Sequence, residues 1–137
     1  MFSKYKLISY RIFSLLFFTT GLFAFVGSLF CWGEGWLFEQ TNLQNIILPL
    51  ADLILTAPLS ILTAYGIASK KYWGIYLGIF TSGIYSLGSI LVFILVIWNG
   101  NPYPLQLIIP PIFGLSISIL YVIWVLKNYK IKFKTKY

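Results

Sequence analysis

The chain offers few residues that could do chemistry. Its 137 residues include three carboxylates, Glu34, Glu39 and Asp52, one cysteine, Cys31, and no histidine. Imidazole bases, Cys/His metal sites, thiol pairs and histidine-based triads therefore cannot be built from it. We expect no catalytic residue, no bound metal and no cofactor, and we favour a non-enzymatic protein. A lipid-modifying enzyme ranks last, because Asp52, Glu34 and Tyr85 alone would have to supply its acid–base chemistry.

Asp52 is the one ionisable side chain inside a long apolar segment. About six residues separate it from Ile46, where that segment begins, which is roughly 9 Å at the helical rise. Thr56 lies one helical turn further along the same face, and Gln106 can approach at a similar depth from another segment. These groups can hydrogen-bond a carboxylic acid, and burial favours its neutral form. Asp52 is therefore a candidate polar anchor for a lipophilic ligand, a cation or a proton.

Two alternatives remain open for these acids. If the helix begins at Pro49, a favourable first-turn residue, Asp52 lies in its first turn, near the positive helix end and close to water. Glu34 is either a solvated loop residue or, because glycines flank it on both sides, a carboxylate that folds back toward Asp52. The predicted ligand-binding set is Asp52, Thr56, Tyr85, Gln106 and Glu34.

The composition predicts that a membrane-spanning helical bundle positions these residues. Hydrophobic residues make up 59% of the chain and charged residues 9%, and the mean hydropathy is +0.86, which excludes a water-soluble domain. Four continuous apolar segments each reach the roughly 20 residues that a helix needs to cross a bilayer, without the alternation of barrel strands. We predict an all-α, four-helix transmembrane bundle, a single domain of residues 1–137 with spans at about 12–32, 46–69, 72–98 and 105–126.

The basic residues predict the orientation of the bundle. All ten fall before the first predicted span, in the turn between the second and third, or after the fourth. Basic residues in short loops mark the cytoplasmic side, so both termini are predicted to be cytoplasmic. The tail from Lys127 to Tyr137 is predicted to contact anionic lipid and not nucleic acid. The first span lacks an Ala-x-Ala cleavage site. We expect a multi-pass protein of a bacterial or archaeal plasma membrane, or of the endoplasmic reticulum in a eukaryote.

Small residues and prolines predict how the spans meet. Gly74 and Gly78 form a GxxxG pattern in the third span, which suits either close packing within the chain, the favoured interpretation, or a dimer seam. Pro58 in the second span and the pair Pro110 and Pro111 in the fourth are expected to kink their helices. A gap among the second, third and fourth spans is therefore the predicted ligand cavity.

The region from Asp52 to Trp73, with a proline-bearing fourth span and a basic tail, resembles the EXPERA family, four-helix membrane proteins that include the emopamil-binding sterol isomerases and the sigma-type receptor. The residues that carry the resemblance are Asp52, Pro58, Ala64, Tyr65, Lys70, Lys71 and Trp73. It implies a cavity for sterols or lipophilic amines in which Asp52 meets the amine, without the histidine that the isomerases use. The pattern is also similar to small four-span bacterial membrane proteins with an early Asp in the second span, which implies a location and no activity.

Three functional hypotheses follow from these features. The preferred one is a non-enzymatic membrane protein that binds a small lipophilic or cationic ligand in a cavity among the helices, with Asp52 as polar anchor. The second is a subunit of a homo-oligomeric transporter or channel that uses Asp52 as a proton or cation site. The third is an accessory subunit of a larger membrane complex. All three place the chain in a lipid bilayer, with no nucleic-acid partner.

Overall fold

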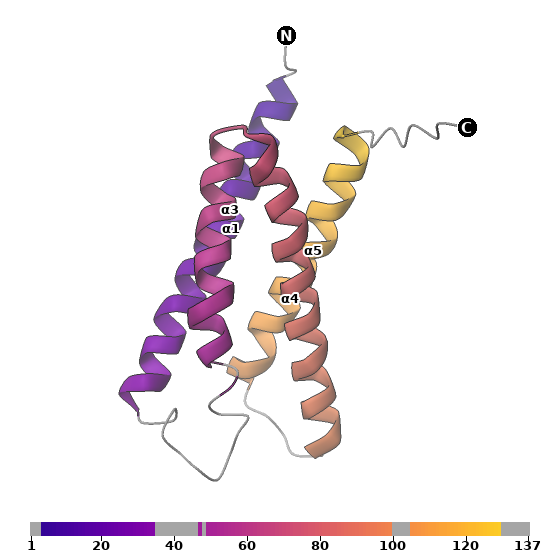
Figure 1. Ribbon diagram of the computed structural model, residues 1–137. Helices are drawn as coiled ribbons and strands as arrows, with labels where there is room; N and C mark the ends of the chain where they lie inside the picture. Colours follow the sequence, from indigo (N-terminus) through magenta and orange to yellow (C-terminus); the bar gives the residue numbers. More distant parts are fainter. Residues whose placement is uncertain (1–3, 35–46, 48, 100–104, 130–137) are drawn as a thin grey trace, which may run out of the picture.

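The computed structural model describes residues 4–34, 47, 49–99 and 105–129. All regular structure in these ranges is helical: α1 spans Lys4–Gly33, the π-helical turn η2 spans Asp52–Thr56, α3 spans Ala57–Ala68, α4 spans Tyr72–Asn99 and α5 spans Leu105–Asn128. The long helices run up and down beside one another (Figure 1). The predicted all-α fold is confirmed.

Four helical stretches of the described chain are long and apolar enough to cross a membrane: Ile8–Gly33, Pro49–Ala68, Tyr72–Trp98 and Ile109–Asn128. The third agrees with the predicted bounds. The first begins four residues before the predicted residue 12, and the fourth ends two residues after the predicted residue 126. These differences are about one helical turn or less. The helical content and the four stretches are those expected of a multi-pass membrane protein.

The up-and-down path brings the basic residues of the described chain to one end of the bundle. In Figure 1 the start of α1, the turn between α3 and α4 and the end of α5 all lie at the top. We call this the basic end. The opposite end, where α1 stops and η2 starts, is called the acidic end because it holds Glu34 and Asp52. The segments at the basic end carry Lys4, Lys6, Arg11, Lys70, Lys71 and Lys127.

A close approach of two glycines sets the turn at the basic end. A Cβ atom on Gly66 of α3 would lie 2.5 Å from the Cα atom of Gly74 on α4, so the two backbones touch and leave no room for a side chain. The N–H of Lys71 donates to the carbonyl of Gly66 at 3.0 Å, and that of Lys70 to the carbonyl of Ile67 at 2.9 Å. These bonds make the Schellman arrangement of a helix C-terminus. Gly74 therefore serves packing within the chain.

Aromatic side chains fill the half of the bundle nearer the basic end. Phe17 of α1 and Tyr121 of α5 are fully buried, and their rings meet edge to face with centroids 5.0 Å apart. The Tyr121 hydroxyl donates to the carbonyl of Ile75 on α4 at 3.1 Å, and Gly78 leaves the space that the Tyr121 ring occupies. This aromatic core ties α1, α4 and α5 together. Its other members are Tyr10, Phe13, Tyr85, Trp124 and Tyr129.

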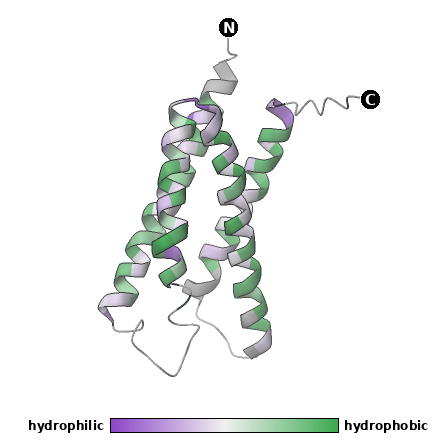
Figure 2. Ribbon diagram, viewed as in Figure 1, coloured by the Kyte–Doolittle hydropathy of each residue, from purple (hydrophilic) through white to green (hydrophobic). Residues whose placement is uncertain are grey.

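The described surface is apolar and the interior is partly polar, which reverses the pattern of a water-soluble protein. Leu15, Phe23, Phe30 and Leu87 are each more than 60% exposed. Figure 2 shows hydrophobic colour along the lengths of the helices and the strongest hydrophilic colour mainly near their ends. Helices surrounded by lipid are expected to look like this, because polar groups then seek partners inside. The buried polar residues are Ser28, Ser60, Thr63, Thr81, Ser82, Ser89 and Ser118.

Candidate functional site

A π-helical turn carries Asp52 and Thr56. In it the N–H of Ala57 donates to the carbonyl of Asp52, five residues back, where a regular α-helix would bond four residues back. Pro58 follows at once, and it has no N–H for the helical ladder while its ring crowds the preceding turn. The kink predicted at Pro58 therefore takes the form of this wider turn. The turn contacts α1 and α4 as well as α3.

Asp52 lies near the acidic end of the second span. The apolar stretch of the described chain runs from Pro49 to Ala68, and residue 48 and residues 35–46 lie outside the described residues, so the depth predicted for Asp52 from Ile46 stays a prediction. Ile47 is helical too, so helical backbone is also found on the outer side of Asp52. The Asp52 side chain is partly buried, so it is partly shielded from the surroundings of the bundle.

The carboxyl group of Asp52 has polar neighbours and no cationic partner among the described residues. Its side chain interacts with that of Thr56, and its charge acts on Tyr85 of α4 and on Cys31 near the end of α1. Within the described ranges, no Lys or Arg forms an ion pair with it. A partly shielded carboxylate without a counter-charge is costly, and either a proton or a bound cation would reduce that cost.

Side chains with hydroxyl groups extend from Thr56 toward the middle of the bundle. We call this set the polar seam, and its members are Thr56, Ser60, Thr63, Thr81 and Tyr85. Ser60 donates to the backbone carbonyl of Thr56, so the Tyr85 hydroxyl, 2.5 Å from the Ser60 oxygen, is the donor to Ser60. One turn further on, the hydroxyl oxygens of Thr63 and Thr81 are 2.9 Å apart. These buried bonds hold α3 against α4. Asp52 lies on the same turn as Thr56, beyond the end of the polar seam.

Three of the five predicted ligand-binding residues come together in this arrangement. Asp52 and Thr56 lie on the same turn and interact, and Tyr85 is connected to that turn through Ser60. Tyr85 is buried and hydrogen-bonded to Ser60, so it supports the turn, and its role toward a ligand stays a prediction. Ser60 follows Thr56 by four residues, but its bond to Tyr85 of α4 could not be predicted from spacing within one helix.

Of the other two predicted residues, the structure describes the side chain of Glu34 alone, and it is not brought to Asp52. Glu34 is exposed in the turn that follows α1, where its backbone N–H donates to the carbonyl of Phe30 at 3.0 Å. Its carboxylate makes no hydrogen bond to Asp52 or Thr56. Gln106 belongs to α5, but its side chain lies outside the described residues, as does all of Glu39.

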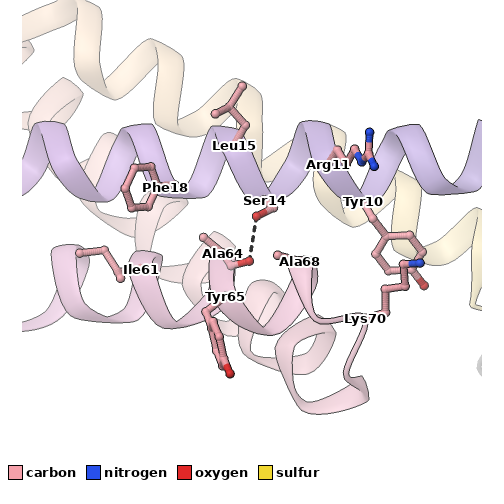
Figure 3. Close-up of a pocket in the computed structure, with 10 residues that line it drawn as sticks. All are labelled: Tyr10, Arg11, Ser14, Leu15, Phe18, Ile61, Ala64, Tyr65, Ala68 and Lys70. Carbon is pink, nitrogen blue, oxygen red and sulfur yellow. Dashed lines mark hydrogen bonds between the residues drawn. The ribbon is translucent and has the colours of Figure 1, made fainter.

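A groove of about 760 Å³ lies elsewhere, between α1 and α3 toward the basic end. Figure 3 shows Arg11 and Lys70 toward one end of it and apolar side chains toward the other. The Ser14 hydroxyl donates to the carbonyl of Ala64 across it at 2.8 Å. None of the five predicted ligand-binding residues lines this groove. It lies between the first and second spans, whereas the sequence predicted a cavity among the second, third and fourth.

Comparison with known proteins gives no relative: no family model, no curated protein and no solved structure matches the chain. The resemblance to EXPERA proteins, and to small four-span bacterial proteins, therefore stays a prediction from the sequence. In the part of the chain that the structure describes, no group of three or more His, Cys, Asp or Glu side chains lies close enough to hold a metal. The geometry around Asp52 is what bears on function.

Proposed function

We propose that this chain is a multi-pass membrane protein that binds a small lipophilic cation through Asp52 at the acidic end of its bundle. The observation that carries the proposal is the partly buried Asp52 carboxyl group, which lies on a π turn and has no Lys or Arg partner among the described residues. π turns of this kind are frequent at functional sites. A cation that binds there supplies the charge that the chain does not.

A charged carboxylate within lipid raises the free energy of the membrane-inserted protein. An aspartate at the centre of a membrane helix costs about 2.5 to 3.5 kcal/mol on insertion scales, and less near the surface. Interaction with Thr56 offsets part of this cost. In the absence of a ligand, a proton neutralises the Asp52 carboxylate. A cation that binds to Asp52 displaces this proton. The site is therefore expected to bind organic cations in competition with protons.

The apolar residues around the π turn favour a ligand with an apolar body. Ile54 and Leu55, on the same turn as Asp52, are 62% and 49% exposed. Leu29 on α1, near Cys31, is exposed as well. A cation that carries aromatic or alkyl groups can place its charge at Asp52 and cover these side chains. Amines and phosphonium ions with such groups are the proposed ligand class.

The distribution of charge supports the proposed orientation. The described basic residues gather at the basic end, and Glu34 and Asp52 lie at the other. With the basic end in the cytoplasm, both termini are cytoplasmic and Asp52 faces the outer side. A ligand would then reach Asp52 from the outer leaflet or from the external medium.

The test is equilibrium binding of tetraphenylphosphonium, a permanent lipophilic cation, to the purified full chain in detergent. The substitution Asp52→Asn keeps the shape of the side chain and removes its charge. We expect it to weaken binding by about tenfold or more, which is about 1.4 kcal/mol. Glu34→Gln removes one charge from the same end of the bundle at an exposed residue and is the matched control, with unchanged binding. Equal affinity of Asp52→Asn and the unaltered chain would overturn the proposal.

Two other hypotheses stay predictions. A homo-oligomeric transporter or channel would use the same Asp52 as its proton or cation site, and cross-linking in the native membrane that gives only monomer would contradict it. If the chain is an accessory subunit, a larger partner protein is expected to co-purify with it in mild detergent. Neither has a specific contact among the described residues that favours it over ligand binding by the single chain.

A further inference from the structure

The groove between α1 and α3 combines an apolar channel with two positive charges. Leu15 and Phe18 of α1 and Ile61 of α3 line its apolar part, and their side chains are 63%, 45% and 39% exposed. It is hollow because small residues, such as Ala64, lie between these larger ones. From Arg11 to Phe18 it runs about 10 Å along α1 at the helical rise. That length suits a hydrocarbon chain lying parallel to the helices.

The charged part of the groove holds Arg11 from α1 and Lys70 from the turn after α3 (Figure 3). Both residues are exposed. The described carboxylates, Glu34 and Asp52, lie at the opposite end of the bundle, and neither Arg11 nor Lys70 forms an ion pair within the described ranges. Two unneutralised cations converge on one end of an apolar channel. This combination is complementary to a molecule with an anionic head and an apolar tail.

The backbone at Lys70 strengthens the argument. Lys70 has a φ of 54°, the left-handed conformation that glycine usually supplies at this position of a Schellman turn. The two hydrogen bonds that close the turn hold Lys70 in this conformation. Glycine would fit the backbone with less strain, so what lysine adds here is its charged side chain.

We propose that the groove binds an anionic diacyl phospholipid of the cytoplasmic leaflet. Arg11 and Lys70 contact its phosphate, with the guanidinium able to give two parallel hydrogen bonds. One acyl chain lies along Leu15, Phe18 and Ile61. The inference rests on the proposed placement of the basic end in the cytoplasmic leaflet and is independent of Asp52. Loss of cation binding at Asp52 would therefore leave it untouched.

Four substitutions test the contributions of charge and shape to lipid binding in the groove. Lys70→Gly removes one of the two charges and relieves the left-handed backbone, so the fold is expected to be kept. Arg11→Gln removes the other charge. Lys71→Gln is the matched control, because Lys71 is an exposed neighbour of Lys70 that does not line the groove. Ala68→Phe fills the groove without changing any charge, since Ala68 is an exposed residue of its lining.

The experiment is native mass spectrometry of the full chain in gentle detergent with phosphatidylglycerol or with phosphatidylcholine of the same acyl chains. We expect the unaltered chain to retain the anionic lipid preferentially. Lys70→Gly and Arg11→Gln should each lower that retention about fivefold, the effect of one basic residue near a membrane surface. Lys71→Gln should leave retention unchanged, and Ala68→Phe should lower it.

Three outcomes would overturn the inference. Equal retention of the two lipids by the unaltered chain would show that the groove does not recognise the charge of the lipid headgroup. A loss with Lys71→Gln as large as with Lys70→Gly would show diffuse attraction to the whole basic end. Displacement of the lipid by inorganic phosphate, with no effect of Ala68→Phe, would show a phosphate site that does not use the apolar groove.

Discussion

The hydroxyl of Tyr85 donates to Ser60 at 2.5 Å, and Ser60 donates in turn to the backbone carbonyl of Thr56. One side chain of α4 is thereby connected to the π turn that carries Asp52. In an interior without water, a broken bond of this kind leaves a buried polar group without a partner. We therefore expect α4 and the Asp52 turn to behave as one unit.

The first prediction tests this connection. Tyr85→Phe removes only the phenolic oxygen, and Ser60 keeps its own bond to Thr56. We expect a loss of about 1 kcal/mol in the free energy of unfolding, with little change in tetraphenylphosphonium affinity because Thr56 still supports Asp52. Thermal denaturation in detergent measures the first quantity and equilibrium binding the second. A variant as stable as the unaltered chain would show that the bond contributes nothing.

Much of the fold could be predicted from the sequence, because continuous apolar segments have few alternatives to membrane helices. The span Tyr72–Trp98 has the predicted bounds. The aromatic core could not be predicted, because lipid and protein interior are both apolar. Hydrophobicity therefore does not separate the buried Phe17 from the exposed Phe80. A single sequence also does not show which residues of different segments lie together, such as Arg11 and Lys70 in the lining of one groove.

The candidate site was predicted in part. Asp52 and Thr56 share a helical face in any regular helix, so sequence spacing suggested their neighbourhood. The π turn that joins them was not predicted, because spacing arguments assume a regular helix and Pro58 indicated only a kink. Glu34 was expected to fold back as one alternative, on the basis of its flanking glycines. It is instead exposed at the end of α1.

The second prediction concerns the contact between α3 and α4. A Cβ atom at Gly74 would lie 2.7 Å from the backbone nitrogen of Ile67 and closer still to Gly66. Gly74→Ala must therefore push the two helices apart, and we expect it to lower the free energy of unfolding by about 1 to 3 kcal/mol.

Gly83→Ala is the control for this substitution, because an added Cβ would have no atom within 4 Å. Alanine is the better helix former, so the control should be unchanged or more stable by up to about 1 kcal/mol. The stability of both variants is compared by heating each protein and measuring the fraction that stays monodisperse on size exclusion. Equal stability of the two would contradict the observed backbone contact.

The third prediction concerns the aromatic core. Tyr121→Ala leaves a cavity where Phe13 and Phe17 meet the lost ring and also removes the bond to Ile75. We expect a loss of about 3 to 5 kcal/mol in the free energy of unfolding. Ile123→Ala, two residues along α5 and 44% exposed, should have a small effect. Similar losses for the two variants in denaturation by sodium dodecyl sulfate would place Tyr121 outside the core.

The fourth prediction separates the π turn from overall stability. Pro58→Ala restores a backbone N–H to the helix, so a regular α-helix can replace the π turn. Asp52 would then turn by roughly 100° relative to α3, the angle of one helical residue. We expect weaker tetraphenylphosphonium binding, by about tenfold, in a protein that denatures at the same or a higher temperature. Unchanged binding would mean that the π turn does not position Asp52.

Both proposed sites require that the two ends of the bundle face opposite sides of a membrane. The direct measurement is cysteine labelling of intact cells with a membrane-impermeant maleimide. Two variants are needed in a Cys31→Ser background, Glu34→Cys at the acidic end and Ser69→Cys in the turn at the basic end. We predict that the first is labelled in intact cells and the second only after lysis. Labelling of both in intact cells, or the reverse pattern, would contradict the proposed membrane placement.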